Sequence, residues 1–481
     1  MNLSILHISD LHRDRKNPIR NDVLLDSLEN DCRHFSAEED PRVRAPDLIV
    51  VSGDIIEGIK SNVPQPEVCL REQYDQALDF LSQLAESFVG GNSTRVVIVP
   101  GNHDVSSYHL EKSLESVDIL PDRKTGLVKE LFTPGSALRW SWRDLQLKRI
   151  VDPQMYKERM GAFAQFYSDF YEGQRIFDLD PAKQVDIFDY PEFDLTIVGF
   201  SSCYNNDLHN RQGAIHPACI AEAGNRLRDP LFSKRLRVAV WHHNTEGPPS
   251  RSDYMDPDIT QNLIDRGFTI GLHGHQHRPQ YLDTRFRHGI ERKITVISAG
   301  TLCGGPDFKH GRAYNIIELS IPDRTGCLHV REMQNDNLNL PIWGRRALPP
   351  NTRSHYEFQY DPPPPPSSTL SESTAVLIEA QDLHINGEYK KAADRLTAVL
   401  NEEKLARPLL LDCLFQIGDT ESLLDIFDPP SNEAEAIHLM DALWNNGKRQ
   451  RLGQVLDTPF IAQSNDPSVA AIRKKYIARL R

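Results

Sequence analysis

The residues of this chain that could do chemistry stand at the ends of five hydrophobic runs. Each run finishes in aspartate, histidine or asparagine, whose oxygen and nitrogen atoms can ligate a metal ion. Such donors suit Mn²⁺, Fe or Zn²⁺ better than metals that prefer thiolates. Seven ligands are too many for one tetrahedral ion and about right for two ions that share a carboxylate. The candidates are Asp10, His12, Asp54, Asn102, His242 or His243, His275 and His277.

Strands must position these side chains, and the run before Asn102 shows how. Residues 96–99 are all β-branched, which predicts a buried strand, and a Pro-Gly pair ends it. Two helical patterns between the first three runs give the order β-α-β-α-β, which predicts neighbouring parallel strands. Ligands bind at the carboxyl edge of such sheets, so Asp10, Asp54 and Asn102 should meet there. The other four runs cover residues 3–12, 47–57, 236–244 and 268–277.

The order of these endings resembles a family signature. Along the chain the blocks read D-x-H, G-D, G-N-H-D, a histidine and G-H-x-H, each after a predicted strand. Together they resemble the calcineurin-like metallophosphoesterases, over roughly residues 1–300. The resemblance implies an α/β fold, a four-layered α-β-β-α sandwich, with two divalent cations at the strand ends.

The resemblance also implies a role for each residue. Asp54 would bridge the two ions, and His243 would be left to contact substrate. His103 would protonate the leaving oxygen, which a pKa near ~6.5 suits, and Asp104 would orient His103 through a hydrogen bond. The ligands of the first ion would be Asp10, His12, His277 and Asp54, and those of the second Asn102, His242, His275 and Asp54.

The activity implied is that of a dinuclear metal-dependent phosphoesterase. G-N-H-D with G-H-x-H is typical of phosphodiesterases and nucleases, and residues 53–58 lack the block of Ser/Thr protein phosphatases. We therefore expect hydrolysis of a nucleotide or nucleic-acid phosphodiester by a hydroxide that bridges the ions, with Mn²⁺ favoured over Fe, Zn²⁺ or Ni²⁺. The alternatives are a DNA exonuclease or endonuclease of the same superfamily, and an interaction protein with a subordinate catalytic domain. Asn244, where many phosphodiesterases have proline, leaves the subfamily open.

Composition predicts three regions. We expect a phosphoesterase domain over 1–350, a proline-rich linker over 351–374 and an α-helical domain over 375–481. Residues 105–180 form an insertion or cap that starts beside the candidate site. A helix over 154–171 would carry an aromatic stripe, which either packs the insertion onto the core or stacks on a base above the site.

The last region has a repeating pattern. Glycines at 387, 418 and 447 break the helices at spacings of 31 and 29 residues, and the first repeat resembles a tetratricopeptide repeat. Such helical repeats predict a surface for a protein partner, although a structural or dimerising role fits the same pattern.

The composition limits the class of protein. A net charge of −13 argues against a long nucleic-acid footprint. Seven scattered cysteines fit a reducing compartment, and the sequence has neither a signal peptide nor an apolar run of ~18 residues. We therefore expect a cytoplasmic protein that does not bind membranes, with its oligomeric state open.

Several neighbouring residues have two interpretations. Glu57 could support the metal site, but the start of a helix is favoured. His7 and His273 are interpreted as structural histidines. The basic run after His12 could bind a phosphate tail or form a solvated loop; its members are Arg13, Arg15, Lys16 and Arg20.

Overall fold

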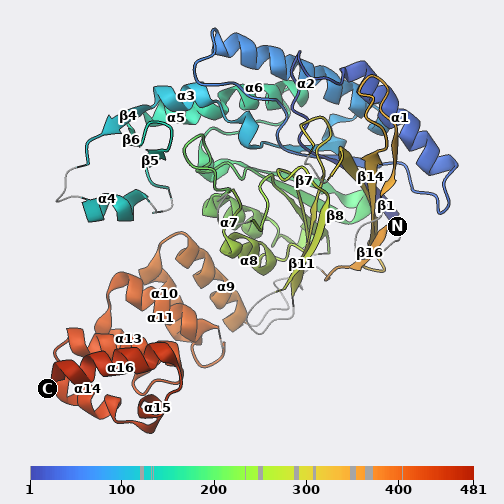
Figure 1. Ribbon diagram of the computed structural model, residues 1–481. Coiled ribbons are helices and arrows are strands. Elements are labelled where there is room, and N and C mark those ends of the chain that lie inside the picture. Colours follow the sequence, from blue (N-terminus) through green and yellow to red (C-terminus); the bar gives the residue numbers. More distant parts are fainter. Residues whose placement is uncertain are drawn as a thin grey trace. The chain divides into compact units, whose positions relative to one another are not determined.

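The chain divides into two compact units, residues Met1–Pro364 and Pro365–Arg481. A computed structural model (Figure 1) describes residues 2–119, 124–131, 133, 135–232, 234–247, 253–285, 292–306, 310–346, 354–362, 372–403 and 405–480. The first unit mixes strands and helices, and the second is helical. Half of the predicted linker, 351–353 and 363–371, lies outside the described residues.

A seven-stranded sheet has the order β15-β14-β13-β1-β2-β3, with β16 paired to β14. As predicted, β1, β2 and β3 are parallel neighbours, while β13 runs antiparallel beside β1. Every residue of β2 and β3 is buried, which explains the β-branched runs at 49–51 and 96–99. The strands are β1 (Asn2–Ile8), β2 (Leu48–Ser52), β3 (Val96–Val99), β13 (Ala313–Ser320), β14 (Thr325–Met333), β15 (Trp343–Arg346) and β16 (Tyr356–Gln359).

A six-stranded sheet has the order β11-β12-β10-β9-β8-β7. Its four central strands are parallel, and β7 and β11 are antiparallel edges. The two histidine runs lead out of β9 and β10 in the middle of this sheet. The strands are β7 (Val185–Tyr190), β8 (Leu195–Phe200), β9 (Leu236–Val240), β10 (Ile270–His273), β11 (Gln280–Arg285) and β12 (Lys293–Ser298).

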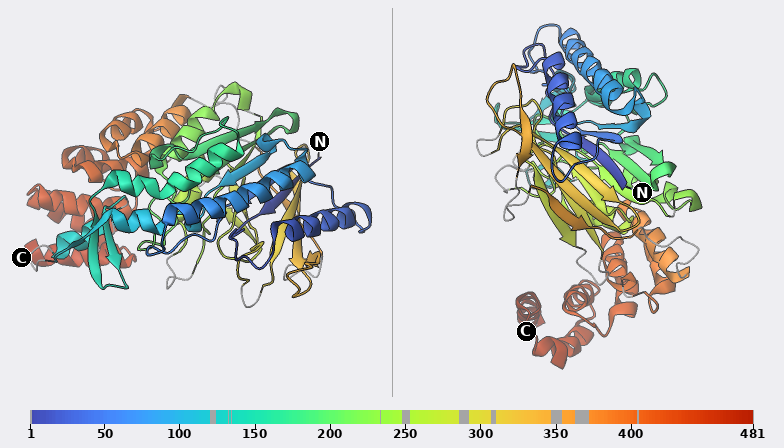
Figure 2. Two further views of the ribbon diagram at one scale, coloured as in Figure 1. Left: turned by 90° about the horizontal axis from the view of Figure 1, so that it is seen from above. Right: turned by 90° about the vertical axis from the view of Figure 1, so that its right-hand side faces the viewer.

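Helices pack on both sheets. Side chains of the two sheets share one hydrophobic core with α1 and α2. These two helices lie side by side in Figures 1 and 2. A second core joins α7 and α8 to the six-stranded sheet. These cores support the predicted four-layered order, which stays a prediction. The bounds are α1 (Asn21–Ala37), α2 (Pro66–Val89), α7 (Pro217–Arg226) and α8 (Pro257–Asp265).

The segment between β3 and β7 combines short helices with a small sheet of order β4-β6-β5, which the sequence did not predict. In α6 the rings of Phe163 and Phe166 are buried against Tyr74 of α2, with ring centroids 6.5 Å and 5.1 Å apart. Buried rings cannot stack on a base, so packing is the correct interpretation of this stripe. The elements are α3 (Ser107–Lys112), β4 (Leu114–Val117), α4 (Lys124–Leu131), β5 (Leu138–Ser141), β6 (Gln146–Ile150), α5 (Pro153–Lys157) and α6 (Gly161–Phe170).

The second unit has its own hydrophobic core. Gly387, Gly418 and Gly447 take positive φ angles of 76°, 69° and 66°, as the predicted helix breaks require. The helices are α9 (Glu372–Ile385), α10 (Tyr389–Val399), α11 (Ala406–Ile417), α12 (Thr420–Phe427), α13 (Glu433–Asn445), α14 (Arg449–Leu456), α15 (Pro459–Ala462) and α16 (Pro467–Leu480). None of the helices described in either unit has both the length and the apolar composition that a bilayer span requires.

Candidate metal centre

The candidate ligands stand on loops at the carboxyl ends of β1, β2, β3, β9 and β10. Five of them have left-handed backbone, with φ between 45° and 74°, a conformation that costs energy for residues other than glycine. Gly53 is also left-handed, and a Cβ there would lie 2.5 Å from His242 Nδ1. The loops are thus strained and closely packed where the side chains meet. The five left-handed residues are Asp10, His12, Asp54, His275 and His277.

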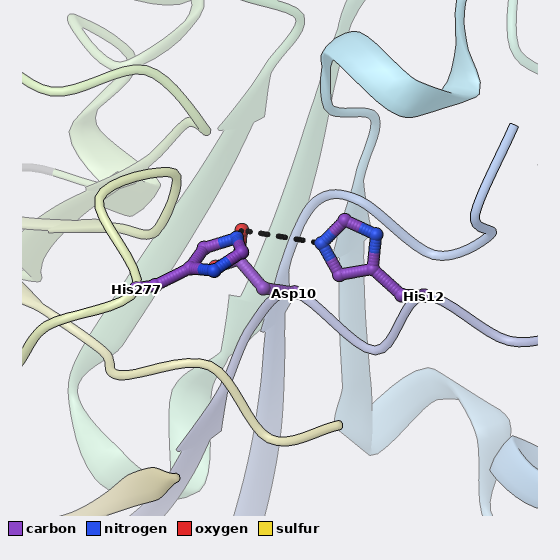
Figure 3. A group of neighbouring side chains, drawn as sticks. All are labelled: Asp10, His12 and His277. Carbon is purple, nitrogen blue, oxygen red and sulfur yellow. Dashed lines mark ion pairs between the residues drawn. The ribbon is translucent and has the colours of Figure 1, made fainter. Parts of the chain in front are cut away.

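The first group of side chains is Asp10, His12 and His277. Figure 3 shows Asp10 between the two imidazole rings. Asp10 Oδ1 lies 3.2 Å from His277 Nε2 and 4.0 Å from His12 Nε2. The donor atoms of all three lie within 4.8 Å of one another. This group brings together two strand ends that are 265 positions apart.

The second group joins the two sheets. Asp54 Oδ2, after β2, lies 3.2 Å from His242 Nε2, after β9, and 3.9 Å from His12 Nε2 of the first group. Asn102 Oδ1 lies 3.2 Å from His242 Nε2 and 2.7 Å from His275 Nδ1. All seven predicted ligands therefore converge, with Asp54 between the two groups.

Backbone amides orient the two carboxylates in the same way. The His275 N–H donates to Asp10 Oδ2 at 3.1 Å, which leaves Oδ1 facing the imidazoles. The His103 N–H donates to Asp54 Oδ1 at 2.8 Å, which leaves Oδ2 facing both groups. Each carboxylate thus has one fixed oxygen and one oxygen directed toward a ring nitrogen.

Three imidazoles are held through Nδ1, and their Nε2 atoms face the centre. His242 Nδ1 donates to the Ser52 carbonyl at 2.8 Å, and His277 Nδ1 donates to the Gly305 carbonyl at 2.7 Å. His12 Nδ1 lies 3.1 Å from Glu57 Oε2. Outer partners of this kind orient metal-binding histidines. The sequence interpretation of Glu57 as a helix start was wrong, because α2 begins at Pro66.

The buried carboxylates of the two groups are stabilised by neighbouring positive charge. Burial opposes ionisation of Asp10, but the hydrogen bond and charge of His277 outweigh it and lower the pKa to about 2. Burial likewise opposes protonation of His242 and His277, yet Asp54 and Asp10 raise the imidazole pKa values to about 9. Without metal, the carboxylates are neutralised by protonated imidazoles.

The residues fit two divalent cations. Asp10 Oδ1 and His12 Nε2 are buried, and their only polar neighbours are other candidate ligands, so these atoms are available to a cation. The donors are carboxylates, imidazoles and one amide oxygen, which suit Mn²⁺, Fe or Zn²⁺. Cations can supply the charge that protonated imidazoles otherwise supply.

His103 and Asp104 follow β3 in the 3₁₀ helix η2 (Asn102–Asp104). His103 Nδ1 contacts the Glu57 carbonyl at 2.6 Å, and the His103 ring meets His12 edge-on with centroids 4.5 Å apart. Burial lowers the pKa of His103, but the negative charge of Asp54 raises it above its ordinary value overall. This histidine therefore keeps its proton to a higher pH than a free imidazole, and it lies beside the first group.

Asp104 does not bond the His103 imidazole, so the expected hydrogen bond was wrong. Its carboxylate accepts from the backbone N–H groups of Gly101 at 2.8 Å and Ile55 at 3.2 Å, and from the Tyr74 hydroxyl at 3.1 Å. Burial, followed by the charge of Asp54, raises the pKa of Asp104 to about 6. Asp104 thus ties the loops after β2 and β3 to α2.

The remaining candidate residues lie outside the two groups. His243 is fully buried with Nδ1 2.8 Å from Ser202 Oγ, and His7 lies inside the sheet 2.9 Å from Ser52 Oγ. Arg13 is buried and donates to the Ile19 carbonyl, so it cannot bind a phosphate tail. In the same run, Arg15 and Arg20 pair with the exposed acids Glu72 and Asp22. His273 is buried beside Trp241.

Similarity to known proteins indicates the family of this chain. A family model described as calcineurin-like phosphoesterase matches residues 3–279, more than half of the chain. No curated protein matches the chain. Similar solved structures include a dimetal phosphatase from Danio rerio, with 12% identity over 69% of this chain and 96% of that chain and a TM-score of 0.36. Another is a purple acid phosphatase from yellow lupin (Lupinus luteus) seeds, with 10% identity over 69% of this chain and 52% of that chain and a TM-score of 0.38.

The family match settles the class of enzyme. It covers every strand end that carries a candidate ligand, from Asp10 to His277. Membership implies a centre of two divalent cations and phosphoester substrates. The chain belongs to the calcineurin-like phosphoesterase family and is a metal-dependent phosphoester hydrolase.

Proposed function

We propose that this enzyme is a dinuclear phosphodiesterase that hydrolyses a nucleotide or nucleic-acid phosphodiester. One observation carries the dinuclear assignment. Asp54 Oδ2 lies 3.9 Å from His12 Nε2 of the first group and 3.2 Å from His242 Nε2 of the second. A carboxylate between two sets of imidazoles is suited to bridge two cations.

The proposed ligands follow from the two groups. Asp54 is shared, and the other six residues divide according to the contacts described above. Mn²⁺ is the proposed metal, and Fe, Zn²⁺ or Ni²⁺ are the alternatives that the same oxygen and nitrogen donors accept. The first ion has Asp10, His12 and His277, and the second has Asn102, His242 and His275.

When bound, two divalent cations supply Lewis acidity for the phosphoryl oxygens and acidify water at the site. The protein contributes the orientation of the ligands and a proton. The Glu57 carbonyl accepts from His103 Nδ1, so the titrating nitrogen is Nε2. The charge of Asp54 keeps the pKa of His103 above its ordinary value, so Nε2 holds a proton to a higher pH than a free imidazole and delivers it to the leaving oxygen.

The choice of a phosphodiester rests on the sequence blocks. Gly101-Asn102-His103-Asp104 and Gly274-His275-Gln276-His277 are the forms typical of phosphodiesterases and nucleases, and residues 53–58 differ from the protein-phosphatase block. All seven cysteines are free, which fits the proposed reducing cytoplasm.

A panel of phosphodiesters tests the proposal. Purified protein is incubated with cyclic nucleotides, dinucleotides, single- and double-stranded DNA and an aryl phosphodiester. We expect turnover that stops on chelation and returns with Mn²⁺. Turnover that persists in chelator contradicts the dinuclear mechanism, and activity confined to phosphomonoesters contradicts the substrate class.

A DNA nuclease is the second candidate, and the G-N-H-D and G-H-x-H blocks support it as well. The net charge of −13 disfavours many phosphate contacts. A steep fall of DNA binding with rising salt favours the nuclease, because each neutralised phosphate releases counterions. A flat salt dependence favours a nucleotide or another small phosphodiester.

We propose that the helical unit is a tetratricopeptide-like repeat that binds a protein partner. Its helices pair around Gly387, Gly418 and Gly447, and the unit has a core of its own. If the unit serves a partner, removal of residues 375–481 leaves turnover of a small phosphodiester unchanged. Loss of that turnover with a folded first unit contradicts the partner role.

A further inference from the structure

Another group of metal-capable side chains lies away from the strand-end centre. Among the described residues, the donor atoms of Glu318, Cys327 and His329 lie within 4.8 Å of one another. Glu318 belongs to β13, and the other two belong to β14. This group is the only one of the described groups that contains a thiol.

The strand register brings the group together. Glu318 is paired with Cys327 across β13 and β14, and Cys327 is paired with Glu357 across β14 and β16. His329 follows Cys327 by two residues, so both side chains point to the same face of the sheet. The ring of His355, just before β16, lies 5.7 Å from the ring of His329.

The individual contacts hold the donors in place while leaving the group accessible. His329 is 4% exposed, and its Nε2 lies 2.9 Å from Glu318 Oε2. The other oxygen of Glu318 accepts from the Arg44 backbone N–H at 3.0 Å. His355 Nδ1 is buried and makes no hydrogen bond. Glu318, Cys327 and Glu357, but not His329, line an open cavity of about 770 Å³, through which an ion can reach the carboxylate and the thiol.

We propose that Glu318, Cys327 and His329 bind one Zn²⁺, with a further donor from the segment that contains His355 and Glu357. Thiolate, imidazole and carboxylate are the donors that zinc takes in proteins. The ion would join β13, β14 and the edge strand β16. It would therefore be a structural site, separate from the phosphoesterase centre.

The thiol of Cys327 must lose its proton to bind zinc. Burial, followed by the charges of Glu318 and Glu357, raises the pKa of the thiol to about 12. Without a cation, the sulfur is therefore protonated. On binding, the thiol proton passes to solvent, and the thiolate forms the bond to zinc, so the exchange needs no oxidant or reductant.

Cobalt substitution tests the site on the full chain. Metal-free protein is titrated with Co²⁺, and thiolate-to-cobalt charge-transfer absorption is recorded in the near ultraviolet. The strand-end centre contains only oxygen and nitrogen donors, so it cannot produce this absorption. We expect the band in the parent chain, its loss in Cys327→Ser and its retention in the control Cys69→Ser, whose cysteine lies on α2.

Zinc content gives a second measurement. We expect Cys327→Ser to hold one zinc fewer per chain than the parent and to keep its phosphodiesterase activity. A parent without the band, or a band that survives Cys327→Ser, overturns the proposal. These outcomes leave the phosphodiesterase proposal unaffected, because activity depends on the other centre.

If Cys327→Ser does not fold, alkylation of the parent protein decides the question. Peptide mapping compares labelling of Cys327 and Cys69 with and without Zn²⁺. We expect Zn²⁺ to protect Cys327 and not Cys69. Equal labelling of Cys327 under both conditions overturns the proposal.

Discussion

The strand-end centre and the Glu318–Cys327–His329 group are built in different ways. In the Glu318–Cys327–His329 group, the hydrogen-bonded β-ladder sets the positions of the donors, since Glu318 and Cys327 are paired residues of neighbouring strands. In the centre, the ligands stand on loops beyond the ladder, often with left-handed backbone. Their positions depend on side-chain contacts with the backbone, such as the amide of His103 on Asp54.

This difference has a consequence for mutations. A site set by strand register depends mainly on its donors. A site built on loops also depends on the residues that orient the donors and on those that tie the loops together. We therefore expect graded losses around the strand-end centre, from the shared carboxylate outward. The four substitutions below follow that gradient.

Asp54→Asn should have the largest effect. The substitution removes the charge between His12 and His242 while keeping the side-chain shape. We expect both metal ions to be lost and turnover to become undetectable, measured by elemental analysis and by phosphodiester hydrolysis. The control is Asp75→Asn, at an exposed position of α2. Full activity of Asp54→Asn would remove the basis for a shared ligand.

His103→Asn should reduce turnover while metal content is kept. Loss of a general acid costs about 10²- to 10⁴-fold in rate, and the cost shrinks when the leaving group needs no proton. We expect a large loss of turnover rate with a nucleotide substrate and a small loss with a substrate whose leaving group is 4-nitrophenolate. Equal losses with both substrates would mean that His103 does not donate a proton.

The pH profile sharpens the same prediction. The pKa of His103 is raised by Asp54, so the protonated form persists above the ordinary value of about 6.5. If His103 acts as the acid, kcat falls as pH rises through its pKa, and His103→Asn lacks this alkaline limb. An unchanged alkaline limb in the variant assigns the titration to another group.

The sequence predicted which side chains meet, because each of them follows a hydrophobic strand. Parallel strands bring their carboxyl ends to one edge, so Asp10, Asp54 and Asn102 could be placed without coordinates. The buried strands and the helix breaks at the glycines were predictable for the same reason, since they depend on local pattern. The small sheet within residues 105–180 was missed, because its short strands mix polar and apolar residues, unlike the apolar runs of β2 and β3.

The supporting contacts were harder to predict. Backbone carbonyls such as those of Ser52 and Gly305 carry no sequence signal, although they orient two imidazoles. The partner of Asp104 is Tyr74, which the helical pattern assigns only to the core. The C-x-H spacing of Cys327 and His329 could have been noticed, because residues two apart share a face of a strand.

Glu57→Gln should have an intermediate effect, because Glu57 contacts a ligand without being one. Its carboxylate lies 3.1 Å from His12 Nδ1. Loss of such an outer partner costs about 10- to 100-fold in metal affinity or activity. We expect weaker Mn²⁺ binding, measured as the metal concentration for half-maximal turnover, with kcat restored at saturating Mn²⁺. Unchanged metal dependence would show that Glu57 does not position His12.

Tyr74→Phe tests the outermost layer and should have the smallest effect on activity. The buried Tyr74 hydroxyl donates to Asp104, whose other oxygen holds the amides of Ile55 and Gly101. A hydrogen bond to a charged group contributes about 1.5–3 kcal/mol to the free energy of unfolding. We expect an earlier unfolding transition of the first unit in denaturant, with turnover near that of the parent. Tyr108→Phe, on α3, is the matched control. If Tyr74→Phe lowers turnover as strongly as His103→Asn, support of the loops matters as much as the proton donor, and the expected gradient is wrong.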